Sequence, residues 1–264
     1  MNPTQPLEAR KQTEADFHDQ RARDKVVKSE QDFENAYPNK KLYAVTREHR
    51  RRMSAWIEQH SPNSVALDFC CGEGEGAIKL AQAGARVHGI DISADSLVLA
   101  REAAKHLPTP PDFQVMDAEN LAFPDNTFDL IYAAGCLHHV DLDRTFKELH
   151  RVLKPGGRIM CNEALAHNPV FHLYRKATPH LRTPWEVPHI LRVPDILKAR
   201  QYFGTIDIQF HYLFCLMAVP FRRTALFKPL LACLEVVDRI ILSIPGVRRL
   251  AWQSTFELAS PRHK

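Results

Sequence analysis

Residues 65–91 read VALDFCCGEGEGAIKLAQAGARVHGID and carry the clearest structural pattern in the chain. The apolar run 65–69 predicts a short buried strand, 75–83 predicts a helix, and 86–92 predicts a second strand. The turn between the first strand and the helix contains three glycines: Gly72, Gly74 and Gly76. Glycine permits a tight turn and a close approach of a ligand to the backbone. The stretch therefore predicts a strand, a glycine loop, a helix and a second strand that together bind a cofactor.

The alternation of strands and helices continues beyond this stretch. Helices are predicted over residues 93–106 and 143–152. Further strands are expected over 113–116, 128–133, 158–162, 203–214 and 251–258. Strands that alternate with helices pair in parallel through right-handed crossovers. The sequence therefore predicts an α/β protein with a doubly wound, mostly parallel, seven-stranded sheet.

Three segments of different composition are expected along the chain. Residues 1–40 are charged and poor in large apolar side chains, so this segment is predicted to be flexible or to form a helix that orders against another part. Residues 41–163 form the cofactor-binding core and begin with an amphipathic helix over 41–60. Residues 164–264 complete the sheet and supply the substrate-binding loops and an apolar helical lid over 225–242.

The bulk composition excludes several classes of protein. The chain has 264 residues and a formal net charge of +4, and its basic residues are scattered, so we expect no nucleic-acid partner. Its six cysteines form neither a disulfide framework nor a zinc pattern. The polar N-terminus lacks an apolar signal core, which favours a cytoplasmic protein with reduced thiols. No apolar run is long enough for a membrane span.

The glycine loop by itself fits NAD, FAD or a nucleotide phosphate equally well. A P-loop is excluded because no lysine followed by Ser or Thr occurs in it. Asp91, at the end of the second strand, can accept hydrogen bonds from ribose hydroxyls, which both NAD and adenosylmethionine carry. Asp117 and Ala118 can contact an adenine ring. The acidic Asp68 and Glu73 would repel a pyrophosphate and attract a sulfonium and an ammonium, which favours adenosylmethionine.

The order of these residues resembles the class I S-adenosylmethionine-dependent methyltransferases. Over residues 60–163 it is most similar to the small-molecule group that includes quinone-ring C-methyltransferases and natural-product enzymes. The resemblance rests on Asp68-x-x-x-Gly72-x-Gly74, Asp91, Asp117-Ala118, Phe128-Asp129 and Arg151-Val152-Leu153-Lys154-Pro155-Gly156-Gly157.

This resemblance implies a Rossmann-like fold with S-adenosyl-L-methionine as the cofactor. It implies that Gly72 and Gly74 line the methionine portion, that Asp91 holds the ribose, and that Asp117 and Ala118 flank the adenine. The full set of predicted cofactor-binding residues is Asp68, Cys70, Gly72, Gly74, Asp91, Ile92, Asp117, Ala118 and Gly135. Gly76 and Gly74 have a simpler interpretation, the close packing of a helix on a strand.

Methyl transfer is an in-line displacement, so the enzyme mainly aligns the reactants and, where needed, removes a proton. Three catalytic candidates follow the fourth and fifth strands: His138, His139 and Glu163. An imidazole titrates near working pH, and burial can raise the pKa of a carboxyl toward that of a useful base. The alternative for the histidines is a buried ring bonded to backbone, and for Glu163 a tie to a neighbouring loop.

The acceptor side is less defined. Arg175 and Arg182 are candidates to clamp a carboxylate or phosphate, against the default interpretation of surface arginines. The histidines of 163–189 fit no metal-site signature, so no metal is predicted. Residues 225–242 carry too many charges for a span. A lid or an oligomer contact is favoured for them over a membrane-surface element, and each suggests an apolar acceptor.

The sequence therefore predicts a methyltransferase that acts on a small, lipophilic, aromatic or prenyl-type acceptor with general-base assistance. A methyltransferase for a protein or RNA is an alternative, although the Asn/Asp-Pro-Pro-Tyr/Phe motif and a basic platform are both missing. A non-catalytic adenosylmethionine-binding protein is another. The expected partner is a small molecule, and homo-oligomers, peripheral membrane contact and the atom methylated (carbon, oxygen or nitrogen) stay open.

Overall fold

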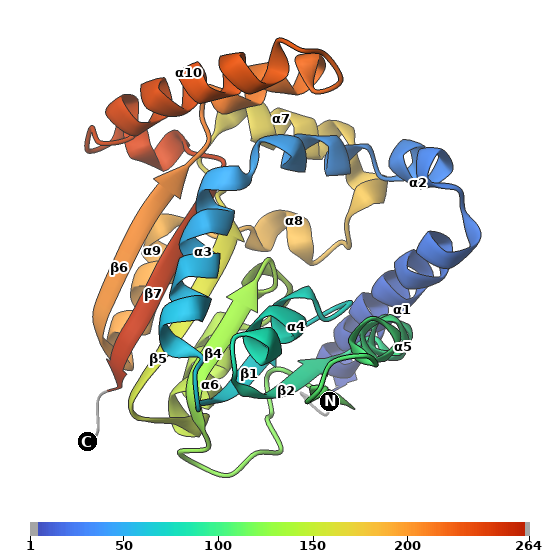
Figure 1. Ribbon diagram of the computed structural model, residues 1–264, viewed down its shortest axis with the longest axis vertical. Helices are drawn as coiled ribbons and strands as arrows, with labels where there is room; N and C mark the ends of the chain where they lie inside the picture. The colour runs from blue at the N-terminus through green and yellow to red at the C-terminus, as the bar shows by residue number, and fades with distance from the viewer. Residues whose placement is uncertain (1–4, 262–264) are drawn as a thin grey trace.

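The computed structural model describes residues 5–261, with side chains from residue 9 onward (Figure 1). Its strands are β1 (Val65–Phe69), β2 (Arg86–Asp91), β3 (Asp112–Val115), β4 (Phe128–Ala134), β5 (Leu153–Ala164), β6 (Phe203–His211) and β7 (Gln253–Pro261). They form one sheet in the order β3-β2-β1-β4-β5-β7-β6. Strands β1 to β5 pair in parallel, and β7 runs antiparallel to both of its neighbours. The predicted mostly parallel, seven-stranded α/β sheet is confirmed.

Several helices begin where the sequence places a capping side chain. Ser93, Asp141 and Asn168 each accept a backbone N–H from the first turn of the helix that follows. The α-helices are α1 (Gln5–Val27), α2 (Glu30–Ala36), α3 (Arg47–His60), α4 (Glu75–Gln82), α5 (Ala94–Ala104), α6 (Leu142–Val152), α7 (Pro169–Ala177), α8 (Glu186–His189), α9 (Val193–Leu197) and α10 (Phe227–Ile241). Short 3-10 helices are η1 (Pro38–Val45), η2 (Leu137–His139), η3 (Pro179–Leu181), η4 (Lys198–Gln201), η5 (Cys215–Phe221) and η6 (Val247–Leu250).

Two predicted elements differ from those observed. The helix expected over 41–60 is divided into η1 and α3 at Thr46. The fifth strand begins at Leu153, five residues earlier than predicted, because the proline-glycine segment after α6 runs extended and pairs Leu153 with Phe128 before a register shift. The bulge accommodates Pro155 in a strand, where its missing N–H would otherwise interrupt the ladder.

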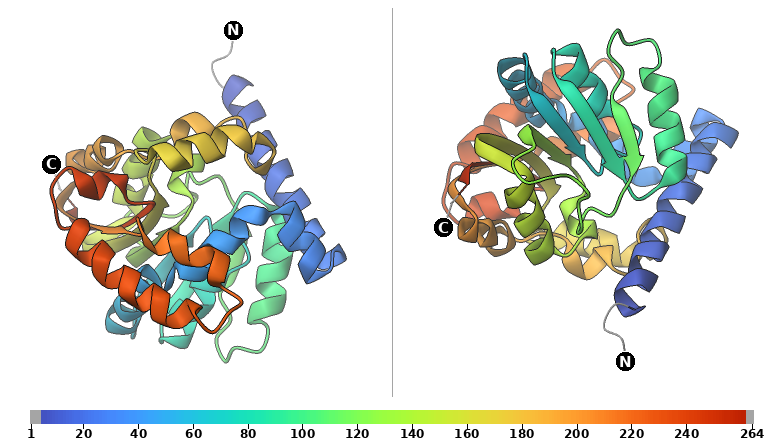
Figure 2. Two further views of the ribbon diagram at one scale, coloured as in Figure 1. Left: turned by 90° about the horizontal axis from the view of Figure 1, so that it is seen from above. Right: turned by 90° about the horizontal axis from the view of Figure 1, so that it is seen from below.

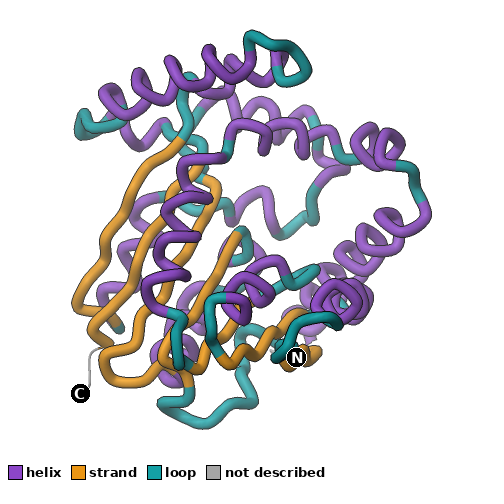
Figure 3. Tube along the Cα trace, viewed as in Figure 1, coloured by secondary structure: helices purple, strands orange, loops and turns teal. Residues whose placement is uncertain are grey.

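The sheet is covered on both faces, as Figure 3 shows for helices in purple around strands in orange. On one face, α3, α4 and α5 bury Trp56, Leu80 and Leu97 against the strands. On the other, α6 and α9 bury Phe146 and Ile196. Burial on both faces explains why the central strands read as continuous apolar runs without polar alternation.

The sheet order places the functional crevice. The chain moves outward from β1 to β3 and then returns to the other side of β1 with β4. Helices diverge to opposite faces at this reversal, which leaves a crevice at the carboxyl ends of β1 and β4. The loops after these two strands, which hold the glycines and the His-His pair, therefore lie on the same side of the sheet.

The N-terminal segment is helical and packs on the core. In Figure 2, α1 runs beside α5 across the end of the sheet. Asp19 accepts hydrogen bonds from the Ser93 hydroxyl at 2.6 Å and from the Asp95 amide at 3.1 Å. Arg23 pairs with the Asp95 carboxylate at 2.6 Å. Helix α1 has no continuous apolar stripe, so polar contacts of this kind hold it against the start of α5.

Helix α10 lies at the far end of β6 and β7, on the outside of the molecule (Figure 1). Two cavities, presented in the next subsection, form the candidate active site. None of the residues of α10, all of which the structure describes, lines either of them. The predicted helix is present at Phe227–Ile241, but the lining of these cavities gives no support to its predicted role as a lid. Among residues 5–261, the structure contains no helix with both the length and the apolarity that a membrane crossing requires.

Gly76 is predicted to be essential for packing α4 onto the sheet. A Cβ at this position would lie 2.7 Å from the Tyr132 ring and 2.9 Å from the Asp68 carboxylate. Gly76→Ala should therefore lower the free energy of unfolding by about 2 kcal/mol. Urea denaturation would measure it. Gly204→Ala, whose Cβ meets nothing closer than 3.4 Å, is the control and should unfold as the parent does. Equal stability of both variants would contradict this packing role.

Candidate active site

A cavity of about 240 Å³ lies where β1, β2 and β4 end. It brings together seven of the predicted cofactor-binding residues: Cys70, Gly72, Asp91, Ile92, Asp117, Ala118 and Gly135. The backbone bends sharply here, with positive φ angles at Cys70, Gly72 and Gly135. A Cβ at Gly72 or Gly135 would meet no atom within 4 Å, so both glycines border open space in this cavity. A ligand can therefore approach the backbone closely at both turns.

Asp91 is held at the floor of this cavity by backbone donors. One carboxylate oxygen accepts the Gly72 amide and the other accepts the Ser93 amide, each at 2.8 Å. Burial raises the pKa of Asp91 above its ordinary value, although these amides oppose the rise. Each oxygen keeps a further lone pair, so the carboxylate can accept two vicinal hydroxyls while it holds the glycine loop.

Two predicted residues lie outside this cavity. Gly74 caps α4, and a Cβ there would come within 2.9 Å of the Phe113 ring, so its place in the structure is one of close packing. Asp68 is buried and accepts the Ala77 amide at 2.6 Å. Burial raises the pKa of Asp68 to about 8, and the nearby Asp91 adds to the rise. Asp68 lines a second, larger cavity.

The second cavity has a volume of about 510 Å³ and is continuous with the first. The two share eight lining residues: His18, Cys70, Cys71, Gly72, Ser96, Ala134, Gly135 and His139. Beyond this junction the larger cavity is lined by the aromatic rings of Phe17, Tyr43 and Tyr132 and by charges of both signs, among them Arg21, Arg50, Glu73, Glu75 and Glu186. The shared wall defines the place where two bound molecules would meet.

Glu163 and His138 form a buried pair beside the larger cavity. One oxygen of Glu163 accepts the amides of Cys136 and Leu137 at 2.8 and 2.6 Å, and the other lies 2.7 Å from His138 Nδ1. Burial opposes a charge on His138, but the Glu163 carboxylate outweighs it and raises the pKa of His138. Glu163 is completely buried and lines neither cavity, whereas the His138 ring lines the larger one.

The sequence indicates His138 and Glu163 as two separate candidate bases, whereas the structure joins them in one hydrogen-bonded pair. Glu163 is closed off from both cavities, so its carboxylate can influence a bound molecule only through the His138 ring that it contacts. Its carboxylate fixes the hydrogen of neutral His138 on Nδ1 and leaves Nε2 to accept a proton. A carboxylate that orients an imidazole is a recurrent device for general-base chemistry.

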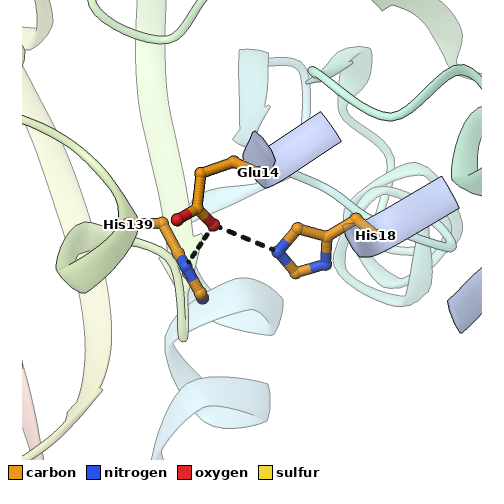
Figure 4. Close-up of side chains that lie close together, drawn as sticks. All are labelled: Glu14, His18 and His139. Carbon is orange, nitrogen blue, oxygen red and sulfur yellow. Dashed lines mark hydrogen bonds and ion pairs between the residues drawn. The ribbon is translucent and has the colours of Figure 1, made fainter. Parts of the chain in front are cut away.

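His139 lies at the junction and contacts the N-terminal helix (Figure 4). Its Nδ1 lies 2.9 Å from Glu14, whose second oxygen accepts the Thr183 hydroxyl. His18, one turn along α1 from Glu14, has its pKa lowered to about 3, chiefly by burial. The three ligand atoms of Glu14, His18 and His139 lie within 4.8 Å of one another, a spacing that would suit a divalent cation. The hydrogen bond between Glu14 and His139 accounts for this spacing without an ion.

Helix α1 contributes residues to the candidate active site that the sequence patterns did not reveal. Arg10 pairs with Glu119, and Lys11 lies 2.5 Å from Asp117, so α1 forms one wall of the smaller cavity. Lys11, Glu14 and His18 follow one another at spacings of three and four residues, and Arg10 precedes Glu14 by four, which places all of them toward one side of the helix. That spacing is the one signal of their shared role, since α1 lacks an apolar stripe.

The two arginines proposed as substrate clamps are instead structural. Arg175 is buried and donates to the Leu165 carbonyl at 3.2 Å from both terminal nitrogens. Arg182 donates to the Thr178 carbonyl at 2.9 Å and pairs with Glu186 at 3.3 Å. Neither lines either of the two cavities.

Comparison with known proteins agrees with this geometry. Residues 67–161 match the family described as Methyltransferase domain. A 2-phytyl-1,4-naphtoquinone methyltransferase of Nostoc punctiforme is 38% identical over 133 residues, which are 48% of this chain and 54% of the relative. Phosphoethanolamine N-methyltransferase 3 of Arabidopsis thaliana is 34% identical over 121 residues, which are 44% of this chain and 25% of the relative. The chain thus spans about half the length of the first relative and a quarter of the second.

A solved structure extends the likeness to the whole fold. The crystal structure of a putative methyltransferase from Bacillus halodurans superimposes with a TM-score of 0.54 at 19% identity, over 79% of this chain and 99% of that chain. The segment that matches the family, residues 67–161, contains every predicted cofactor-binding residue. Residues 67–161 therefore match a methyltransferase domain, in agreement with the sequence motifs, and the solved structure supports the same fold.

Asp91→Asn tests the predicted ribose contact. The amide group keeps the shape but turns an N–H₂ toward a backbone N–H, and it removes a charged acceptor. Affinity for adenosylhomocysteine should fall by about 2 kcal/mol, or about thirtyfold. Calorimetry would measure the change. Asp129→Asn is the matched control, because Asp129 bonds Val65 and Lys154 outside both cavities and should leave affinity unchanged. Unaltered affinity in Asp91→Asn would refute the assignment.

Proposed function

We propose that this protein transfers a methyl group from S-adenosyl-L-methionine to a small aromatic acceptor, with His138 as general base. The observation that carries the proposal is the junction of the two cavities. The smaller cavity is lined by most of the residues predicted to bind the nucleoside, and the larger one is lined by His138, with Glu163 bonded behind it. A methyl donor and an acceptor bound on either side would meet at their shared wall.

The residues around the smaller cavity fit the proposed donor. Asp91 has the spare lone pairs for the ribose hydroxyls. Asp117 and the Ala118 amide supply an acceptor and a donor for the adenine edge. The donor itself brings a sulfonium, which makes its methyl group electrophilic and its neutral thioether a good leaving group. The carboxyl of Asp68 lies close by, and a cationic ligand favours its ionised form.

The His138–Glu163 pair supplies the proton transfer. As the acceptor atom attacks the methyl carbon, its proton passes to His138 Nε2, and the carbon–sulfur bond breaks with its electron pair left on sulfur. The positive charge that develops on the imidazole is balanced by the buried Glu163 carboxylate. General-base assistance of this kind contributes about 10²–10⁴ in rate.

An aromatic acceptor with an ionisable hydroxyl or ring carbon fits the larger cavity best. Phe17, Tyr43 and Tyr132 supply flat apolar surfaces, and the histidines stand at the end nearest the donor. The quinone methyltransferase relative supports an aromatic acceptor, whereas the phosphoethanolamine methyltransferase relative supports a small cationic one. The described wall of this cavity carries four cations (Arg21, Lys40, Arg50 and Lys79) and four acids (Asp68, Glu73, Glu75 and Glu186), so its charge does not decide between the two, and the aromatic rings favour the aromatic acceptor.

Calorimetry and a methylation assay would test this function in turn. We expect adenosylmethionine to bind, and labelled methyl groups to appear on a reduced naphthoquinone in preference to phosphoethanolamine. A protein extract and total RNA serve as the macromolecular comparison. No binding of adenosylmethionine at hundreds of micromolar would refute the donor, and binding without transfer to any of these would leave a non-catalytic binding protein as the better description.

Glu163→Gln should abolish the base function while it preserves the fold of the loop. The amide oxygen can still accept the Cys136 and Leu137 amides, but the N–H₂ then donates to His138 Nδ1 and places the ring hydrogen on Nε2. The turnover number should fall by about 10²-fold or more, as in His138→Ala, with donor affinity unchanged. Steady-state kinetics and calorimetry would separate the two quantities. Full turnover in both variants would show that alignment alone suffices.

The pH profile offers an independent check. His138 must be unprotonated to act as a base, and Glu163 holds its pKa above the ordinary value of 6.5. The turnover number should therefore rise with pH through a pKa above 6.5 and be lost on acidification below it. An acidic limb at or below the ordinary histidine pKa would exclude His138 as the titrating base.

A further inference from the structure

Residues 221–250, here named the α10 face, expose apolar side chains and bury acidic ones. The apolar side chains more than a third exposed are Phe221, Leu226, Val236, Ile240, Ile244 and Leu250. The inward stripe of α10 and its end holds Leu231, Glu235, Asp238 and Leu242, at helical spacing. A surface helix ordinarily turns its apolar stripe to the core and its charges to water. Half of the inward stripe of α10 is acidic instead.

The buried acids fix this orientation. Asp238 accepts the backbone amides of Leu213, Phe214 and Cys215 at 2.9, 2.7 and 3.1 Å, and so it caps the start of η5. Glu235 pairs with Arg47 of α3, with a second contact at 2.6 Å. Rotation of α10 would strip both carboxylates of their partners in a buried setting, which is costly. The apolar face therefore points outward because the fold requires it.

The charges left outside are all basic. Residues 221–250 contain two acids, Glu235 and Asp238, and both are buried. The six basic residues are Arg222, Arg223, Lys228, Arg239, Arg248 and Arg249, and all but the half-buried Arg222 are exposed. Arg223 and Arg239 reach Glu34 and Glu48 at 3.3 and 3.4 Å through exposed pairs that water screens well. An apolar surface ringed by cations is complementary to an anionic lipid bilayer.

We propose that the α10 face docks on the surface of an anionic membrane. Val236 and Ile240 would enter the boundary between head groups and acyl chains, and the arginines would lie among the lipid phosphates. The exposed Met217 of η5 extends the same apolar surface. The left view of Figure 2, from above, shows α10 and η6 together on this end of the molecule.

The membrane face and the acceptor cavity are joined by one short segment. Helix η1 packs against η5, and its residues Asn39, Lys40 and Tyr43 line the larger cavity. A buried apolar cluster that includes Val45, Cys215 and Leu231 connects η1 to η5 and α10. A docked protein would thus hold its acceptor cavity one layer of helix from the lipid.

Vesicle co-sedimentation tests the docking directly. The intact protein is mixed with vesicles of phosphatidylcholine alone or of phosphatidylcholine with phosphatidylglycerol. We expect strong binding only to the anionic vesicles, and weaker binding as the salt concentration rises. The assay contains neither methyl donor nor acceptor, so its result does not depend on the proposed methyl transfer.

Substitutions on exposed positions separate docking from folding. Val236→Asp with Ile240→Asp should lower the vesicle partition constant by about tenfold or more. Arg248→Gln with Arg249→Gln should lower it by about twentyfold, since each arginine near an anionic surface is worth about fivefold. Val98→Asp, on the exposed side of α5, is the matched control and should bind as the parent does. Circular dichroism checks that every variant is folded.

Three results would overturn the proposal. One is an intact protein that binds neither vesicle, and another is equal binding to both vesicles. The third is a dimer in analytical ultracentrifugation that Val236→Asp dissociates without any vesicle binding, which would assign the face to a second copy of the chain. Loss of vesicle binding in the two α10-face variants, with retention in Val98→Asp, supports membrane docking.

Discussion

The candidate active site depends on one buried carboxylate. Glu163 ends the fifth strand, and its two oxygens hold three groups from the loop after the fourth strand. A fully buried charge without hydrogen-bond partners would be costly. The loop supplies these partners to the carboxylate, and the carboxylate in turn fixes the position of the loop. The position of His138, and through it the shape of the acceptor cavity, follows from this mutual requirement. The parallel pairing of β4 with β5 brings the partners together.

The fold was largely predictable because its signals are local. Short apolar runs, glycine turns and capping residues specify the strands and helices one at a time, and the rule for parallel crossovers then limits their order. The same holds for the location of Asp91 and Gly72, which line the smaller cavity as their place after strands β2 and β1 predicts. The predicted start of the fifth strand was wrong because of Pro155. A proline usually ends a strand pattern, but here a bulge accommodates it within the strand.

The acceptor side was less predictable because its contacts join distant segments. His138 and Glu163 were each recognised as a candidate base, but nothing in the sequence shows that one is bonded to the other. The polar face of α1 pairs with residues about a hundred positions away, such as Lys11 with Asp117. Arg175 appears exposed by composition, yet its guanidinium supports the Leu165 carbonyl inside the fold. The spacing of the α1 residues indicates that they share a helix face, but it does not identify their distant partners.

Helix α1 has a consequence for the order of events in a catalytic cycle. Its residues line both cavities, with Lys11 at the adenine end and His18 at the junction. The contact between Lys11 and Asp117 occupies an acceptor that an adenine amino group would use, so a nucleoside must compete with the helix for it. Because α1 lines both cavities, its undocking would expose both to solvent together. Under the proposed function, release of a spent donor and exposure of the acceptor would then share one motion, and a turnover limited by it would respond to α1 substitutions that touch no reacting atom.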